Sequence, residues 1–183
     1  EDYSDAEHAE KFYEENRKSG ISLCISKMSY TYHNGTKVFM RADFEAHPHE
    51  IVALVGPSGE GKTTLLRIML ALLHIQSGDE DLVGAKTGEV LTITPAARRL
   101  FSYVPQGNTM FSGTIAENMR NVRPDATDEE IKEVLIVSCA WEFVQKLPDG
   151  IYSKVGERGG GFSEGQAQRL SIARALLRRA PIL

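Results

Sequence analysis

Eight consecutive residues carry the clearest chemistry in this chain, Gly56-Pro57-Ser58-Gly59-Glu60-Gly61-Lys62-Thr63. They match the spacing G-x-x-x-x-G-K-[ST] at every fixed position. The glycines let the backbone curl so that its N–H groups face inward, and with the positive end of a following helix these groups form a cradle for phosphate oxygens. In such a cradle Lys62 pairs with the outer phosphates and the Thr63 hydroxyl is a ligand for Mg²⁺. We therefore expect this stretch, the phosphate loop, to bind the phosphate chain of a nucleotide.

The residues on either side of the phosphate loop predict the elements that hold it. An apolar run before the loop, residues 51–55, indicates a buried strand, and residues 64–70 indicate a helix that begins with Thr64. The alternative is a glycine-rich turn at the head of an ordinary helix. The coincidence of strand, loop, Lys62 and Thr63 favours the phosphate-binding interpretation.

A second stretch has the residues of an anion site at a helix N-terminus. A glycine-rich run, residues 155–161, leads into Phe162-Ser163-Glu164-Gly165-Gln166. Ser163 and Gln166 have the spacing of a capping box, which predicts a helix that continues through Leu177. Taken alone, this stretch is better explained as a glycine-rich loop that caps an ordinary helix.

One polar residue, Gln106, follows a third apolar run. Residues 100–104 predict a buried strand that leads directly into Pro105-Gln106-Gly107. In open α/β sheets, ligands bind outside the carboxyl ends of the strands. We therefore expect Gln106 to contact the nucleotide or its metal ion.

Composition and charge exclude some of the protein classes in which such motifs occur. The chain has 183 residues, of which 42% are apolar and 25% are charged, enough for one domain with a core and a subdomain. Its net charge of −4 argues against broad electrostatic binding to nucleic acid. The longest apolar run, residues 68–73, is far shorter than the ~20 residues of a membrane span, so we expect a soluble polypeptide.

The remaining segments predict short strands and a helical insertion. Residues 1–20 are acidic with scattered aromatic side chains, so we expect a solvated helix or a linker there rather than a core element. The other predictions are a hairpin of residues 21–25 and 37–41 around the turn His33-Asn34-Gly35, a loop at residues 77–81, a strand at residues 89–94, a capping-box helix from Thr127, and a short helix at residues 140–147. Residues 114–147 thus form a helical insertion.

Together, these motifs resemble the nucleotide-binding domain of ATP-binding cassette (ABC) transporters, from about Ile21 to the end of the chain. Tyr103-Val104-Pro105-Gln106 resembles the family's Q-loop and Phe162-Ser163-Glu164-Gly165-Gln166 its signature sequence, in the family's order. Residues 110–118 and 155–159 resemble the exporter branch. The resemblance implies an α/β fold, a P-loop NTPase (RecA-like) core with an antiparallel β subdomain and an α-helical subdomain at about residues 107–162.

The resemblance also implies which side chains contact ATP and Mg²⁺. Residues of the phosphate loop and Thr64 would hold ATP, Thr63 and Gln106 would hold Mg²⁺, and Lys62 and Gln106 would be the catalytic residues. Tyr32 stands where the family places an aromatic ring that stacks on adenine; packing within an edge strand is the alternative. Residues of a second copy would cap the γ-phosphate, namely Ser163, Gly165 and Gln166.

By the same resemblance, the chain works with two partners. One is a second nucleotide-binding domain, identical or different, and the other is a transmembrane domain fused upstream, with residues 1–20 as the linker. The location would be the cytoplasmic face of the cell membrane, and the function the coupling of ATP binding and hydrolysis to export. The alternative is a non-transport ABC ATPase of translation or DNA repair, whose mark would be basic insertions that bind nucleic acid. This sequence shows none.

Two departures from the family's pattern affect the expected activity. Glu164 replaces the usual glycine of the signature and adds a negative charge near the nucleotide, unless its side chain points to solvent. Downstream of the signature the sequence contains no strand ending in Asp-Glu and no switch histidine. We therefore expect a domain truncated before that strand, which would begin near Ile182, and one that binds ATP without hydrolysing it. A nucleotide-binding module with no competent catalytic site is the third interpretation.

Overall fold

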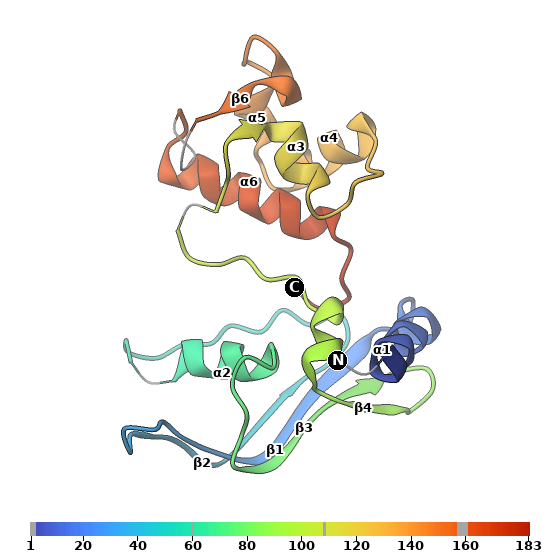
Figure 1. The fold of residues 1–183 in the computed structure, drawn as a ribbon, viewed down its shortest axis with the longest axis vertical. Coiled ribbons are helices and arrows are strands. Elements are labelled where there is room, and N and C mark those ends of the chain that lie inside the picture. Colours follow the sequence, from blue (N-terminus) through green and yellow to red (C-terminus); the bar gives the residue numbers. More distant parts are fainter. Residues whose placement is uncertain (1–2, 60, 108, 157–160) are drawn as a thin grey trace. The chain divides into compact units, whose positions relative to one another are not determined.

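The computed structural model describes residues 3–59, 61–107, 109–156 and 161–183. The chain divides into two compact units. The first unit contains the residues up to Phe101 together with Ile182, and the second unit contains residues 102–181 and Leu183. Figure 1 labels the helices and strands of both units.

The first unit is built on a four-stranded antiparallel sheet with the strand order β2-β1-β3-β4. Its strands are β1 (Ile21–Thr31), β2 (Lys37–Ala46), β3 (Ser77–Gly84) and β4 (Val90–Thr92). The predicted hairpin is thus confirmed as β1 and β2, and the strand at residues 89–94 as the shorter β4. The predicted loop at residues 77–81 is wrong. These residues pair with β1 and form the first half of β3, because backbone pairing with a distant strand overrides their local turn composition.

The N-terminal segment forms α1 (Tyr3–Asn16). We predicted a solvated helix or linker rather than a core element, and this is wrong for one face of the helix. Ala9, Phe12 and Asn16 are each 0% exposed. The side-chain oxygen of Asn16 accepts hydrogen bonds from the backbone N–H groups of Lys86 and Thr87, at 3.3 and 3.4 Å. A helix can be acidic overall and still bury one narrow stripe in this way.

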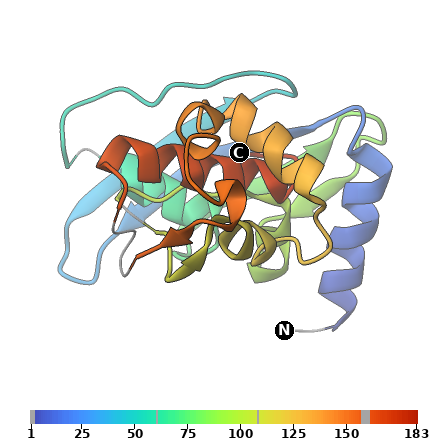
Figure 2. The ribbon, with the colours of Figure 1, turned by 90° about the horizontal axis from the view of Figure 1, so that it is seen from above.

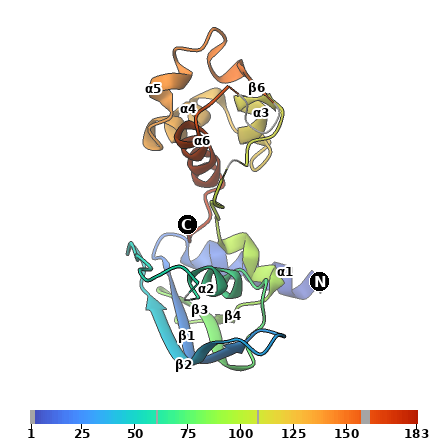
Figure 3. The same cartoon turned by 90° about the vertical axis from the view of Figure 1, so that its left-hand side faces the viewer.

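An α-helix and a 3₁₀ helix lie over one face of this sheet (Figure 3). They are α2 (Lys62–Met69), which confirms the helix predicted after the phosphate loop, and the 3₁₀ helix η1 (Pro95–Leu100). Leu65 and Ile68 of α2 and Leu100 of η1 lie in one apolar cluster with residues of β1 and β3.

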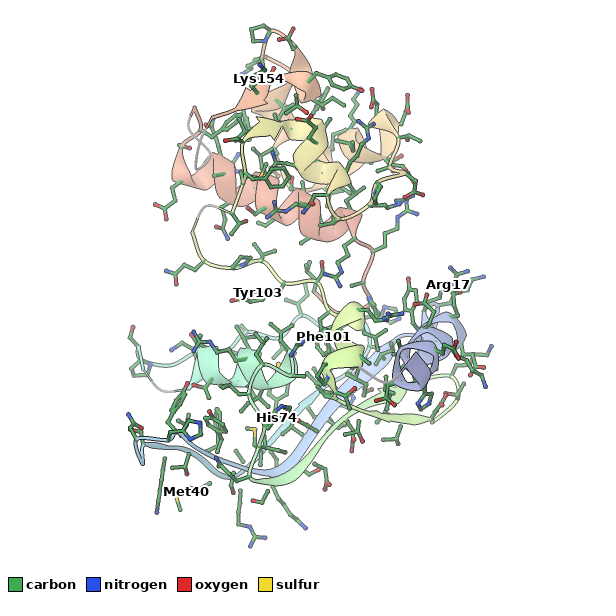
Figure 4. All side chains as sticks on the ribbon, viewed as in Figure 1. Arg17, Met40, His74, Phe101, Tyr103 and Lys154 are labelled. Atoms are coloured by element: carbon green, nitrogen blue, oxygen red, sulfur yellow. The ribbon has the colours of Figure 1, made fainter. Side chains whose placement is uncertain are left out.

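Two predicted buried strands are not present as strands in the structure. Residues 51–55 form no strand, and Ile51 and Val55 are 101% and 92% exposed. Among the described residues no strand pairs with this segment, and without a backbone partner an apolar run is not a strand. Of residues 100–104 only Phe101 pairs, in a single parallel bridge with Ile182. Tyr103, labelled in Figure 4, is 48% exposed.

The second unit is mainly helical. It contains β5 (Gly113–Thr114), α3 (Ile115–Arg120), α4 (Asp128–Val137), α5 (Trp141–Val144), η2 (Gly150–Tyr152), β6 (Lys154–Val155) and α6 (Glu164–Leu177). Figure 2 shows α6 and α4 side by side, and Leu170 of α6 lies in the same core as Ile131 and Leu135 of α4. Residues 114–147 contain α3, α4 and α5, in agreement with the helices expected there, and α6 packs into the same core. A helical subdomain at about residues 107–162 stays a prediction. No helix in the described part of the chain is long and apolar enough to cross a membrane.

Candidate functional site

The phosphate loop curls around the ammonium group of Lys62. Lys62 is the first residue of α2, and its Nζ donates hydrogen bonds to the carbonyl oxygens of Gly56 and Pro57, at 2.7 and 2.5 Å. The positive charge is therefore held against the loop backbone by contacts that phosphate oxygens could replace. Glu60, also predicted as a nucleotide contact, lies outside the described residues.

Two glycines of the loop have conformations that explain their residue type. Gly61 has φ 91°, and a Cβ atom there would lie 2.8 Å from Cγ1 of Val38 and 3.0 Å from Cζ of Phe39. Only glycine fits between the loop and strand β2 at this point. Gly59 has φ 88°, and a Cβ atom there would meet nothing within 4 Å, so the backbone is open on that side. An open concave backbone is what an approaching phosphate requires.

The two threonines that follow Lys62 have different surroundings. Thr63 is exposed, and within residues 3–59, 61–107, 109–156 and 161–183 its hydroxyl has no hydrogen-bond partner. Thr64 is 6% exposed, and its hydroxyl shares a hydrogen bond of 2.8 Å with the hydroxyl of Tyr32. Thr63 is thus free to bind a metal ion, whereas Thr64 has a structural partner.

Tyr32 lies directly after β1 and is partly buried. Its ring meets that of Tyr30 edge to face, with the centroids 5.1 Å apart and the planes at 84°. With the bond to Thr64, this contact anchors Tyr32 beside the helix that carries Lys62. Tyr32 therefore packs within the first unit, but not in an edge strand as the alternative supposed, because it follows β1, which is an inner strand of the sheet. The stacking role stays a prediction.

The residue types of this site fit a nucleotide phosphate with Mg²⁺. Lys62 supplies a cation, Gly59 supplies an open backbone before a helix N-terminus, and Thr63 supplies a hydroxyl oxygen that has no partner among the described residues. Hard cations such as Mg²⁺ take a few protein oxygens and complete their shell with phosphate and water. Within the described residues no group of three His, Cys, Asp or Glu side chains is placed to hold a metal by itself.

The signature residues begin α6 as predicted. Ser163 is the N-cap; its Oγ accepts from the backbone N–H of Gln166 at 3.2 Å, and Oε1 of Gln166 accepts from the backbone N–H of Ser163 at 3.0 Å. Gly165 is exposed, and a Cβ atom there would meet nothing within 4 Å. Glu164 is exposed, which favours a side chain in solvent. Residues 157–160 of the preceding glycine-rich run lie outside the described residues.

The predicted site residues fall into two groups. The first unit brings together Tyr32, Lys62, Thr63 and Thr64 with the described part of the phosphate loop. The second unit holds Gln106, which is exposed, and the signature residues. A magnesium site shared by Thr63 and Gln106 stays a prediction, because these residues belong to different units.

Sequence reasoning missed one buried acid and one partly buried cation. Glu80 of β3 is 8% exposed, and its Oε2 is buried without a hydrogen-bond partner among the described residues. Burial, assisted by the nearby charge of Asp81, raises the pKa of Glu80 to about 7. Arg174 of α6 contacts Thr109. Glu80 lies in a segment predicted as a loop, and Arg174 lies far from Thr109 in sequence. No local sequence pattern therefore predicted the burial of Glu80 or the contact of Arg174 with Thr109.

Comparison with protein families gives one match over most of the chain. The ABC transporter family matches residues 39–183. Among individual proteins, an export ATP-binding/permease protein of Rickettsia felis is 35% identical over 179 residues, covering 94% of this chain and 30% of the relative. The mitochondrial iron-sulfur clusters transporter ATM1 of Candida albicans is 40% identical over 158 residues, covering 86% of this chain and 21% of the relative. This chain therefore spans less than a third of either relative.

Solved structures with a similar fold include that of a bacterial Atm1-family ABC exporter with ATP bound, with a TM-score of 0.76 and 29% sequence identity. The similarity covers 87% of this chain and 27% of the exporter chain.

Proposed function

This chain belongs to the ABC transporter family, and from that premise we propose that residues 21–183 are the ATP-binding part of an exporter's nucleotide-binding domain. The structural similarity confirms the predicted α/β class and the P-loop NTPase fold. Both relatives are transporters or export proteins, which favours transport over the alternative of a non-transport ATPase in translation or DNA repair.

The observation that carries this proposal is the position of Lys62. Its ammonium group lies against the carbonyl oxygens of Gly56 and Pro57, in a loop whose backbone is open at Gly59. Within the described residues this cation contacts only neutral carbonyl groups and forms no ion pair, so an anionic phosphate chain is its natural partner. The exposed Thr63 hydroxyl lies on the next residue.

We assign the residues of this chain the following roles. Lys62 and the loop N–H groups bind the β- and γ-phosphates of ATP and neutralise charge as the γ-phosphoryl group is transferred. Thr63 and Gln106 would hold Mg²⁺, which when bound would offset the negative charge of the phosphate chain. Tyr32 contacts the adenine ring, and Thr64 keeps Tyr32 beside α2 through their shared hydrogen bond.

The proposal includes two protein partners. One is a second nucleotide-binding domain, whose Ser163, Gly165 and Gln166 cap the γ-phosphate bound by this chain, since the N-terminus of α6 presents N–H groups and a positive dipole end. The other is a transmembrane domain, as in the Rickettsia felis relative, in which ATP-binding and permease parts are fused. Residues 1–20 would lead from that domain, and the chain would lie at the cytoplasmic face of the membrane, without nucleic acid as a partner.

Replacing Lys62 tests the proposal. We expect Lys62→Ala to weaken ATP binding by roughly 100-fold or more, because a charge-assisted contact to the triphosphate is lost. Isothermal titration calorimetry with Mg²⁺-ATP would measure this. Lys146→Ala is the control, since Lys146 is an exposed lysine of the second unit. Equal affinities of Lys62→Ala and the unmutated chain would overturn the assignment of the phosphate loop.

A further inference from the structure

The segment that carries Gln106, residues 102–109, is hydrogen-bonded to α6 at both of its ends. At the first end, the Oγ of Ser102 donates to the carbonyl oxygen of Ala175 at 2.7 Å. At the other end, the Oγ1 of Thr109 shares a hydrogen bond of 2.9 Å with the Oγ of Ser171. Ser102 and Ser171 are 6% and 3% exposed, so both bonds are shielded from water. All of these residues belong to the second unit.

Arg174 makes the strongest of these attachments. Its two terminal nitrogens each donate to the carbonyl oxygen of Thr109 at 3.1 Å, and one of them also donates to Oγ1 of Thr109 at 2.7 Å. Hydrogen bonds from a charged guanidinium are stronger than those between neutral groups, and the planar fork fixes direction as well as distance. Thr109 is thus held at its backbone and at its side chain by the same residue.

The burial of Arg174 indicates that this contact is costly to make. The side chain is partly buried, and within the described residues it forms no ion pair with a carboxylate. Burial lowers the pKa of Arg174, although a guanidinium stays charged at physiological pH. A desolvated cation is destabilising unless its donors are satisfied, and here Thr109 supplies the acceptors.

We propose that Arg174 is a positioning residue for Gln106. Ser171, Arg174 and Ala175 lie on one face of α6, at spacings of three and four residues, and together they fasten both ends of residues 102–109 to this helix. The segment that carries Gln106 is therefore fastened at both ends to the helix that Ser163 caps. The consequence for nucleotide binding rests on the proposed function, whereas the attachment itself does not.

The attachment is tested first without nucleotide, by backbone ¹⁵N relaxation. We expect the order parameters of Gln106 and Gly107 to fall from about 0.85 towards 0.6 in Arg174→Ala, with the amides of α6 unchanged. Thr109→Val removes only the hydroxyl contacts and should lower the order parameters of Gln106 and Gly107 by a smaller amount. This second variant keeps the test decisive if Arg174→Ala fails to fold. The matched control is Arg169→Ala, because Arg169 also lies on α6 but donates to the carbonyl oxygen of Cys139 at 3.2 Å. Unchanged order parameters in both test variants would overturn the proposal.

The second measurement separates positioning from general stability. We compare the affinity for ATP in the presence of Mg²⁺ with the affinity in the presence of EDTA. The ratio of the Mg²⁺ affinity to the EDTA affinity should fall by about five- to tenfold in Arg174→Ala, as in Gln106→Ala. The affinity of Arg174→Ala in EDTA should be unchanged. Arg174→Lys should restore part of the ratio, since one ammonium can still reach the Thr109 carbonyl. An equal loss in Mg²⁺ and EDTA would contradict positioning. If the unmutated chain binds no ATP, the proposed function fails, and the order parameters alone decide the attachment of Gln106.

Discussion

Tyr32 contributes two separable groups to the first unit, a ring and a hydroxyl. The ring packs against Tyr30, and the hydroxyl bonds to Thr64 on the helix that begins with Lys62. If the ring also stacks on the nucleotide base, removing the ring and removing the hydroxyl must have different effects on binding.

We expect Tyr32→Ala to weaken ATP and GTP alike, by about 1–3 kcal/mol, because stacking on a ring face discriminates little between bases. Tyr32→Phe keeps the ring and should bind both nucleotides nearly as well as the unmutated chain. Calorimetry with each nucleotide measures both variants. Unchanged affinity in Tyr32→Ala would show that the ring serves only the packing of the sheet.

Glu80 makes the stability of the first unit depend on pH. Its pKa is raised to about 7 from an ordinary value near 4.5, chiefly by burial. The native state therefore binds more protons than the unfolded state between about pH 4.5 and 7. Stability that is present below pH 4.5 is lost as the pH rises through 7, after which the loss is constant.

Replacing Glu80 with a neutral residue should remove this dependence. We expect Glu80→Gln to be more stable than the unmutated chain by roughly 1–3 kcal/mol at pH 8 and to show little difference at pH 4.5. Urea unfolding of the first unit, followed by amide signals of β3, would measure this. Asp79→Asn, at an exposed neighbour, is the control. An advantage of equal size at both pH values would contradict the assigned pKa shift.

At the scale of elements, α2 depends on its neighbours for stability. It has 8 residues, too few for a stable isolated helix, which needs at least ~12. Its C-terminal end is held by Arg98 of η1, whose Nε and a terminal nitrogen donate to the carbonyl oxygens of Leu70 and Ala71, at 2.8 and 2.6 Å. A cation at this end also opposes the negative end of the helix dipole. The following residue, Arg99, instead forms an exposed ion pair with Glu10 of α1 at 2.8 Å.

These adjacent arginines form a matched pair for mutation. Arg98→Ala should destabilise the first unit by about 1.5–3 kcal/mol, because charge-assisted bonds to helix carbonyl groups are lost. Arg99→Ala should cost at most ~1 kcal/mol, as is usual for an exposed ion pair. Thermal unfolding of both variants is the measurement, and equal losses would mean that Arg98 does not cap α2.

At the scale of the whole chain, binding of ATP and hydrolysis of ATP need different groups. Hydrolysis of ATP needs a base that orients water and a fully held metal ion. These 183 residues supply the phosphate loop and Gln106, but no Asp-Glu pair at the end of a strand downstream of Ser163 and no histidine that can be assigned as the switch. The N-terminus of α6, which carries Ser163, would act on a partner's nucleotide.

We therefore expect this 183-residue chain to bind ATP without measurable turnover. We also expect Ser163→Ala to change the affinity of the chain for ATP by no more than about twofold, which is less than the contribution of one hydrogen bond. Phosphate release and calorimetry on the purified chain measure these two quantities. Turnover that Lys62→Ala abolishes would show that another residue of this chain serves as the base.

Interactions within four residues could be predicted from the sequence. The capping boxes of Thr127 with Glu130 and of Ser163 with Gln166 are present with both of their hydrogen bonds, and α2 follows the phosphate loop. The order of the motifs was also sufficient for the fold class and the family. Local contacts are encoded by spacing alone, since the backbone geometry of a helix turn is always the same.

Contacts between distant residues were decided only by the tertiary structure. Residues 77–81 form a strand because β1 pairs with them, and residues 51–55 do not, because no described strand lies beside them. Arg174 and Thr109 are 65 positions apart, and no sequence pattern in either segment predicts their contact. Backbone hydrogen-bond partners and the partners of buried charges are chosen by proximity in space, which spacing along one segment does not specify.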